Sequence, residues 1–163
     1  MTNNLIPLAR SVAPKASVSK LRMSLGEFSA PDIESVSSAI EFAISPTYET
    51  ANENGEFICT VCFKLRAVTD DDERNETGLR VHANFDISIS IDGEHEEDAI
   101  DAFIRLNSVF VTWSYLREFV QSCTSRMQLP ALTLPLMTVN AIEQHLLQEN
   151  DCDEDETKSS VIT

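Results

Sequence analysis

The longest regular pattern in this chain is the alternation of apolar and polar residues over residues 79–92, which read L-R-V-H-A-N-F-D-I-S-I-S-I-D. Neighbouring side chains of a β-strand point to opposite faces, so the pattern predicts a strand with one buried face and one wet face. Such strands are typical of antiparallel sheets, and at ~3.4 Å per residue this one would span roughly 45 Å. Other elements must therefore cover a long apolar surface.

Three further strands are expected upstream. Residues 21–25 alternate and are followed by Gly26, which is expected to mark a β-bulge. Residues 40–45 and 56–69 alternate as well, and polar turns at 47–55 and 70–78 separate them from each other and from the long strand. The last three strands are therefore predicted to be successive antiparallel partners.

After residue 92 the apolar spacing changes from two to about 3.6, which predicts helices. Asp98 is expected to cap the first helix, and β-branched residues at 109–112 indicate a break before a second helix at 114–127. Two prolines make residues 129–136 an extended apolar loop, and a last helix is expected at 138–149. The predicted fold class is α+β, a four-stranded antiparallel sheet with helices packed on one face.

The ends of the chain have weaker patterns. We expect residues 1–20 to be a flexible arm, residues 21–149 to form the folded domain, and residues 150–163 to be an acidic disordered tail. The formal net charge of −15 excludes an ordinary nucleic-acid partner, because phosphate binding needs a basic face. No apolar run is long enough to insert into a membrane and no signal peptide is recognisable, so a cytoplasmic protein is expected.

No motif in the sequence indicates catalysis. Cys59-x-x-Cys62 is half of a zinc-knuckle spacing, but it lies in a strand whose residues three apart face opposite ways. His82, His95 and His145 fall on different elements, and no phosphate loop or nucleophile motif is present. We therefore expect no catalytic residues, no metal, no cofactor and no enzymatic activity. A metal enzyme that uses the acidic residues 92–101 is the competing hypothesis.

Apolar residues concentrate around the predicted loop. Trp113, Tyr115 and the leucines of residues 129–136 follow one another closely. In one interpretation they close the core over the sheet; in the other, some of them line a groove for extended peptide, because exposed apolar patches mark interaction sites. Composition alone does not choose between the two.

Residues 113–142, W-S-Y-L-R-E-F-V-Q-S-C-T-S-R-M-Q-L-P-A-L-T-L-P-L-M-T-V-N-A-I, resemble the signature of the protein-export chaperone family SecB. Residues 27–32, E-F-S-A-P-D, resemble the segment that ends the first strand in that family. The matching positions of the longer segment are Tyr115, Arg117, Glu118, Ser125, Arg126, Pro130, Leu132 and Leu134.

The resemblance implies a SecB-like homotetramer, a dimer of dimers, that holds non-native polypeptide in apolar grooves without ATP. Tyr115, Arg117 and Glu118 are expected to be structural. Carried over to this sequence, the peptide-binding candidates are Phe28, Ile33, Val36, Trp113, Leu129, Leu132 and Leu134. The candidates for the oligomer interface are Ile100, Phe103 and Ile104.

Ser114, Met127 and residues 133–136 depart from the pattern of the export chaperones. SecB-like chaperones also occur in toxin–antitoxin–chaperone systems, and the Y-L-R-E and L-P-x-L-x-L-P segments resemble those members as well. A holdase dedicated to an antitoxin is therefore our leading hypothesis. The alternatives are a general export chaperone that delivers preproteins to the translocase motor, and an adaptor subunit that binds one folded partner.

Overall fold

The computed structural model describes residues 4–30, 39–68, 79–129 and 132–156. Its elements follow one another along the chain as α1 (Leu5–Val12), a 3₁₀ turn η1 (Ala13–Lys15), β1 (Ala16–Ser29), β2 (Ala39–Tyr48), β3 (Glu56–Val68), β4 (Arg80–Ile91), α2 (Glu97–Arg126) and α3 (Val139–Glu156).

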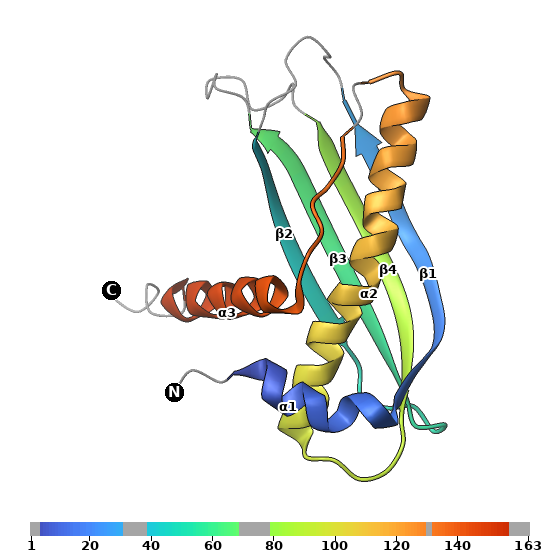
Figure 1. The fold of residues 1–163 in the computed structure, drawn as a ribbon, viewed down its shortest axis with the longest axis vertical. Coiled ribbons are helices and arrows are strands. Elements are labelled where there is room, and N and C mark those ends of the chain that lie inside the picture. Colours follow the sequence, from blue (N-terminus) through green and yellow to red (C-terminus); the bar gives the residue numbers. More distant parts are fainter. Residues whose placement is uncertain (1–3, 31–38, 69–78, 130–131, 157–163) are drawn as a thin grey trace, which may run out of the picture.

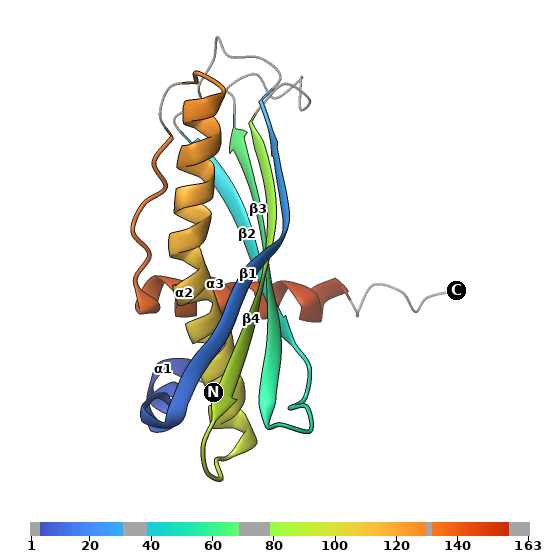
Figure 2. The ribbon, with the colours of Figure 1, turned by 90° about the vertical axis from the view of Figure 1, so that its right-hand side faces the viewer.

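The four strands form one antiparallel sheet in the order β1-β4-β3-β2. The predicted succession of β2, β3 and β4 as neighbours is therefore confirmed, and β1 returns to pair with β4. In Figure 2 the sheet is seen nearly edge-on, with α1 and α2 on one side of it. The α+β fold with a helix layer on one face is thus the predicted one.

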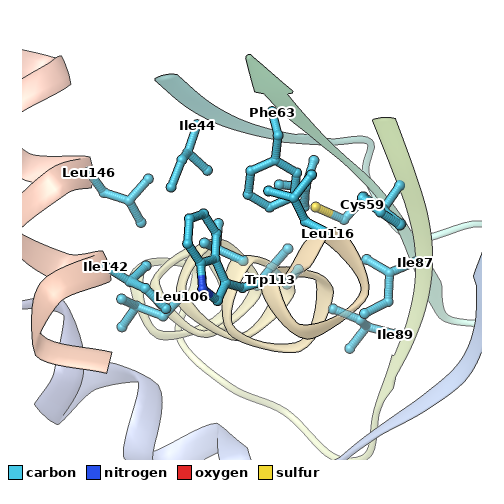
Figure 3. Close-up of a cluster of buried hydrophobic side chains, with 14 of the residues drawn as sticks. Ile44, Cys59, Phe63, Ile87, Ile89, Leu106, Trp113, Leu116, Ile142 and Leu146 are labelled. Atoms are coloured by element: carbon cyan, nitrogen blue, oxygen red, sulfur yellow. The ribbon is translucent and has the colours of Figure 1, made fainter. Parts of the chain in front are cut away.

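The alternation of the long strand becomes an alternation of burial. Val81, Ala83, Phe85, Ile87 and Ile89 are all buried, whereas the residues between them keep partial contact with solvent. Figure 3 shows several of these side chains packed against the inner surface of α2. Burial of this apolar face supplies the main driving force for the fold, at ~25 cal/mol per Å² of apolar surface.

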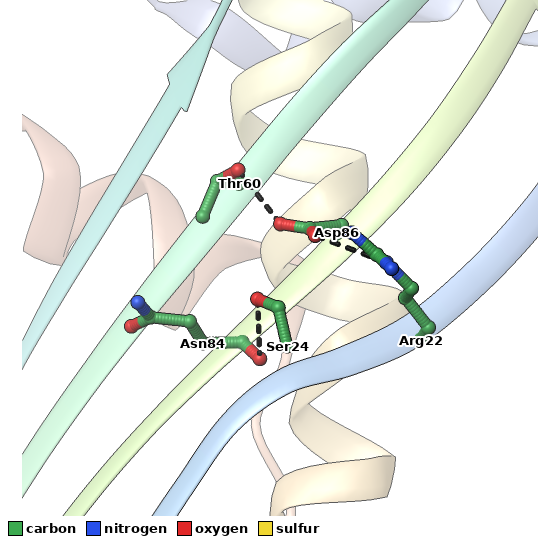
Figure 4. Close-up of polar contacts among 5 residues, drawn as sticks. All are labelled: Arg22, Ser24, Thr60, Asn84 and Asp86. Atoms are coloured by element: carbon green, nitrogen blue, oxygen red, sulfur yellow. Dashed lines mark hydrogen bonds and ion pairs between the residues drawn. The ribbon is translucent and has the colours of Figure 1, made fainter.

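The opposite face of the sheet is polar and has its own cross-strand contacts (Figure 4). Asp86 of β4 accepts hydrogen bonds from Thr60 Oγ1 of β3 at 2.9 Å and from Arg22 Nη2 of β1 at 3.0 Å. The β1–β4 register shifts between Met23 and Leu25, so the expected β-bulge lies just before Gly26 rather than at it. Opposite-charge and hydroxyl pairs of this kind help to hold three adjacent strands in register.

Gly26 has a packing role instead. A Cβ atom at this position would lie 3.1 Å from the Phe119 ring of α2 and 3.0 Å from the Met23 sulfur. The missing side chain therefore allows α2 to approach β1 closely.

The predicted break at residues 109–112 is wrong, because α2 is one helix of 30 residues. Val109 and Thr112 are fully buried, and Thr112 Oγ1 donates a 2.6 Å hydrogen bond to the Ser108 carbonyl. Packing against the sheet thus outweighs the low helix propensity of the β-branched residues. Among the described residues, no helix is both long and apolar enough to cross a membrane.

The two ends also differ from expectation. The segment expected to be a flexible arm contains α1 and the start of β1, and Leu5 and Val12 of α1 are buried. At the other end α3 continues to Glu156, into the segment expected to be a disordered tail, while residues 157–163 lie outside the described part. In Figure 1 α3 points away from the sheet, with its first turns beside α1 and α2.

Candidate functional site

The loop between α2 and α3 is held against α2 by hydrogen bonds to its backbone. Trp113 Nε1 donates to the Pro135 carbonyl at 2.9 Å, and Arg117 Nε donates to the Leu134 carbonyl at 2.9 Å. Both carbonyls belong to a segment without regular structure, so these side chains replace the ladder partners that the segment lacks. The loop is therefore a fixed part of the helix layer.

Trp113 itself belongs to the core. Its ring centroid lies 5.7 Å from that of Phe42 and 5.9 Å from that of Phe63, and only 3% of the residue is exposed. Leu134 is 2% exposed. Both were expected to contact peptide, but they have almost no surface to offer. Their contribution is to anchor the loop, Trp113 through its indole N–H and Leu134 through its carbonyl and its buried side chain.

The C-terminus of α2 determines where Leu129 lies. Gln128 has a φ of 57°, in the left-handed region, and its N–H donates to the Ser125 carbonyl at 3.2 Å. The N–H of Leu129 donates to the Thr124 carbonyl at 3.0 Å. This pair of bonds is a Schellman motif, which ends the helix and sends the chain back along it. Leu129 remains partly exposed at this turn.

Several apolar residues remain accessible around this end of the helix layer. Of the predicted peptide-binding residues, Phe28, Leu129 and Leu132 are partly exposed, whereas Ile33 and Val36 lie outside the described residues. The structure adds exposed Met23 and Met127 and the partly exposed Phe119. We call this set the apolar rim, and it consists of Met23, Phe28, Phe119, Met127, Leu129 and Leu132.

Half of the rim, Met23, Phe119 and Met127, was not predicted from the sequence. Phe119 and Met127 belong to the helix predicted at 114–127 and Met23 to the strand predicted at 21–25, and none of the three was expected to contact peptide. Their exposure depends on how far α2 and the loop extend over the sheet, which no local pattern shows.

A second apolar surface lies in the helix layer. A cleft of about 330 Å³ is bounded by α1, α2 and the first turn of α3. Phe103 lines it and Phe110 is nearly half exposed. Among the expected interface residues, Ile100 is partly buried. Ile104 is fully buried in the hydrophobic core of the chain, so it has no surface with which to contact another chain. We refer to this surface as the helix cleft.

The titratable groups near these surfaces stabilise the fold. Tyr48 donates a 2.9 Å hydrogen bond to Asp101, which joins the end of β2 to α2, and burial followed by this bond raises the pKa of Tyr48 to about 12. Burial raises the pKa of the Cys59 thiol to about 11. Cys59 and Cys62 face opposite sides of β3, as predicted, and in the described part of the chain no three His, Cys, Asp or Glu side chains form a metal cluster.

No protein-family model matches the sequence, and no curated protein does. Among solved structures, the fold is similar to that of the SecB-like chaperone of Mycobacterium tuberculosis in complex with a ChAD peptide from an antitoxin. The TM-score is 0.65 at 20% identity, over 84% of this chain and 98% of that chain. A protein of unknown function from Streptococcus agalactiae matches with a TM-score of 0.45 at 10% identity, over 74% of this chain and 96% of that one.

Proposed function

We propose that this chain, which has the SecB-like fold, is an ATP-independent cytoplasmic chaperone that holds one aggregation-prone polypeptide, an antitoxin. One observation carries the proposal. The solved SecB-like chaperone that shares this fold over 84% of the chain was captured with an antitoxin peptide. The residues 113–142 that resemble the family lie in the part of the helix layer where the peptide-binding candidates gather.

The apolar rim supports the proposal physically. The rim residues come from β1, the C-terminal part of α2 and the loop that follows it, and Met23 and Phe119 meet beside Gly26. Exposed apolar side chains that lie together mark interaction sites. Two of the six rim residues are methionines, which adapt to many shapes because their side chains are unbranched and flexible. A net charge of −15 keeps such a chain soluble while it exposes this surface.

The helix cleft supports the proposal that several copies of the chain assemble into an oligomer. We propose that Phe110 and Ile100 contact a second copy of the chain in a homotetramer, because Phe110 is exposed beside an apolar cleft whose wall includes Phe103, itself only 6% exposed. Burying such surfaces is what stabilises most homo-oligomers. Ile104 is not part of this proposal, since it is fully buried.

The test is suppression of aggregation by the purified protein without nucleotide. A denatured enzyme such as citrate synthase is diluted into buffer, and light scattering is followed at increasing chaperone concentration. We expect suppression by the native chain and a weaker effect for Leu132→Asp on the rim. Ile58→Asp is the matched control, because Ile58 is an exposed apolar residue of the polar sheet face. Scattering that is unchanged at several-fold molar excess would refute the holdase function.

Native mass spectrometry of the protein isolated from its own cells identifies the client class. One stoichiometric small partner on a tetramer near four times 18.2 kDa supports a dedicated antitoxin chaperone. A mixture of many polypeptides supports instead a general export chaperone that serves the translocase motor. A single natively folded partner, with no affinity for unfolded chains, supports an adaptor subunit.

A further inference from the structure

Three chemically active side chains meet on the polar face of the sheet, the face that α2 does not cover. Cys62 of β3, His82 of β4 and Glu27 of β1 come from three neighbouring strands. The Cys62 Sγ lies 3.4 Å from His82 Nε2, and His82 Nδ1 lies 3.6 Å from Glu27 Oε2. The imidazole therefore has a thiol at one nitrogen and a carboxylate at the other.

This order of groups is the one that activates a nucleophile. A carboxylate at Nδ1 favours the tautomer with a proton on that nitrogen, which leaves Nε2 free to take the proton of the thiol. The thiolate is the reactive form of cysteine, and a neighbouring imidazolium stabilises it. We propose that Cys62 is a reactive thiol, activated by His82 and positioned by Glu27, that forms a mixed disulfide with small charged disulfides.

The sheet register holds the three residues together. Glu27 and His82 are direct cross-strand partners, and Cys62 is the partner of Asn84, the next residue on the same face as His82. Cross-strand neighbours have Cβ atoms ~5 Å apart, so the arrangement depends on strand pairing rather than on a loop. All three strands belong to the same stable sheet.

Space for an adduct lies beside His82. A cleft of about 750 Å³ is lined by His82, by charged residues that include Lys64, Arg66 and Glu41, and by apolar residues that include Phe28 and Leu65. Cys62 contacts it through His82. The charged groups of a small disulfide would find partners of opposite sign among Lys64, Arg66 and Glu41 of this cleft.

The other described thiols provide an internal comparison. Cys59 is fully buried and its pKa is raised by burial, and the pKa of Cys123 is also raised, first of all by burial. In the described part of the chain, the thiol with a histidine nitrogen at hydrogen-bond distance is Cys62. Cys59 and Cys123 should therefore react as ordinary or protected thiols.

The proposed step is a thiol–disulfide exchange. The proton of Cys62 passes to His82 Nε2, and the thiolate attacks one sulfur of the incoming disulfide. A new sulfur–sulfur bond forms, the original one breaks, and one small thiolate leaves. The proton then returns to solvent from His82, and excess small thiol reverses the reaction.

The experiment measures the reaction of each cysteine with 5,5′-dithiobis(2-nitrobenzoate), an anionic disulfide. The full chain carries Cys152→Ser, because the side chain of Cys152 lies outside the described residues. Modified peptides are quantified by mass spectrometry over time. We expect Cys62 to react about tenfold faster than Cys123, with His82→Asn removing about that factor; full general-base catalysis gives ~100-fold or more. Glutathione disulfide then replaces the aromatic reagent as a second probe.

A pH profile separates activation from simple exposure. As long as the pH is below the pKa of an ordinary thiol, its reaction rate rises about tenfold for each unit by which the pH is raised, because the thiolate fraction rises by that factor. Glu27→Gln should change the pH dependence of the Cys62 rate without changing the thermal midpoint, because it removes the carboxylate beside His82 Nδ1. The charged groups that face His82 from its own and the two adjacent strands are Glu27, Lys64, Arg66 and Arg80.

The native chain alone tests the proposal if His82→Asn fails to fold. A Cys62 rate no higher than that of Cys123 in the native chain, or a pH dependence of the Cys62 rate that Glu27→Gln leaves unchanged, would overturn it. An unchanged Cys62 rate in a folded His82→Asn variant would do the same.

Discussion

The backbone N–H of Ile6 donates a 3.0 Å hydrogen bond to Glu143 Oε1, which joins the first turn of α1 to α3, 137 residues further along the chain. The first turn of α1 has no acidic residue, and its N-cap residue makes no side-chain hydrogen bond. Glu143, only 7% exposed, therefore acts as the cap of α1 from another helix. This contact joins α1 and α3, two of the three helices that bound the helix cleft.

Glu143→Ala should loosen α1 and leave the sheet intact. Loss of an N-terminal cap costs about 1 kcal/mol, and the loss here is confined to the helix that Glu143 contacts. Hydrogen exchange followed by mass spectrometry should show faster exchange in residues 5–12 and unchanged exchange in β4. Glu118→Ala, an exposed carboxylate of α2, is the control and should change neither. Equal protection of α1 in both variants would refute the capping role.

The conformation of Gln128 makes a prediction about the end of α2. A non-glycine residue in the left-handed region costs roughly 1 kcal/mol, so Gln128→Gly should raise the free energy of unfolding by about that amount. Met127→Gly is the matched control, because Met127 has a φ of −86° and gains nothing from glycine. Urea denaturation followed by circular dichroism measures both. Equal effects of the two substitutions would contradict the Schellman geometry.

Trp113→Ala should lower the free energy of unfolding, and any loss of peptide binding should follow from that loss of stability. Its ring is packed between Phe42 and Phe63, and truncating such a residue to alanine costs about 3–5 kcal/mol. Tyr115→Ala should change stability by less than about 0.5 kcal/mol, since that ring is half exposed on the same helix. Urea midpoints distinguish the two. A fully stable Trp113→Ala variant would place the side chain outside the core.

Burial of the Tyr48 phenol, together with its hydrogen bond to Asp101, predicts a loss of stability at high pH. The pKa of Tyr48 is raised from 10.0 to about 12 in the folded chain, so the neutral phenol is favoured by folding. Its stabilising contribution is complete below the pKa of the unfolded chain and is lost as the pH rises from about 10 to about 12. Comparing the free energy of unfolding of the native chain with that of Tyr48→Phe across this range isolates the effect. Parallel curves would mean that neither the burial of the phenol nor its hydrogen bond makes the free energy of unfolding depend on pH in this range.

Much of this fold was predictable because its main strand has an unbroken period of two. Each apolar residue from Val81 to Ile89 in that pattern is buried, since one sheet face is covered along its length. Residues 5–12 had too short an apolar stripe to predict a helix, and α1 exists because α2 and Glu143 pack against it. The continuity of α2 through Thr112 likewise depends on burial, which is a tertiary effect.

The sites were less predictable than the fold. The same apolar residue types occur in binding grooves and in cores. The sequence therefore could not show that Trp113 and Leu134 are buried whereas Leu132 is partly exposed. Cys62 and His82 seemed unrelated because they are distant along the chain. The register of β3 against β4 brings them together, and register is set by the whole sheet.

Leu132 and Leu134 therefore offer a paired test of the apolar rim. They are two residues apart in the same loop, but Leu134 is buried while Leu132 is partly exposed. Leu134→Ala should cost about 2–5 kcal/mol of stability, and Leu132→Ala less than that because part of its surface is already in water. If the rim holds unfolded chains, Leu132→Ala should also weaken binding to a carboxymethylated, permanently unfolded protein by about tenfold, the loss of about 1.4 kcal/mol of contact. Fluorescence anisotropy measures the affinity and urea denaturation the stability. Unchanged affinity in the stable Leu132→Ala variant would exclude this part of the loop from the binding surface.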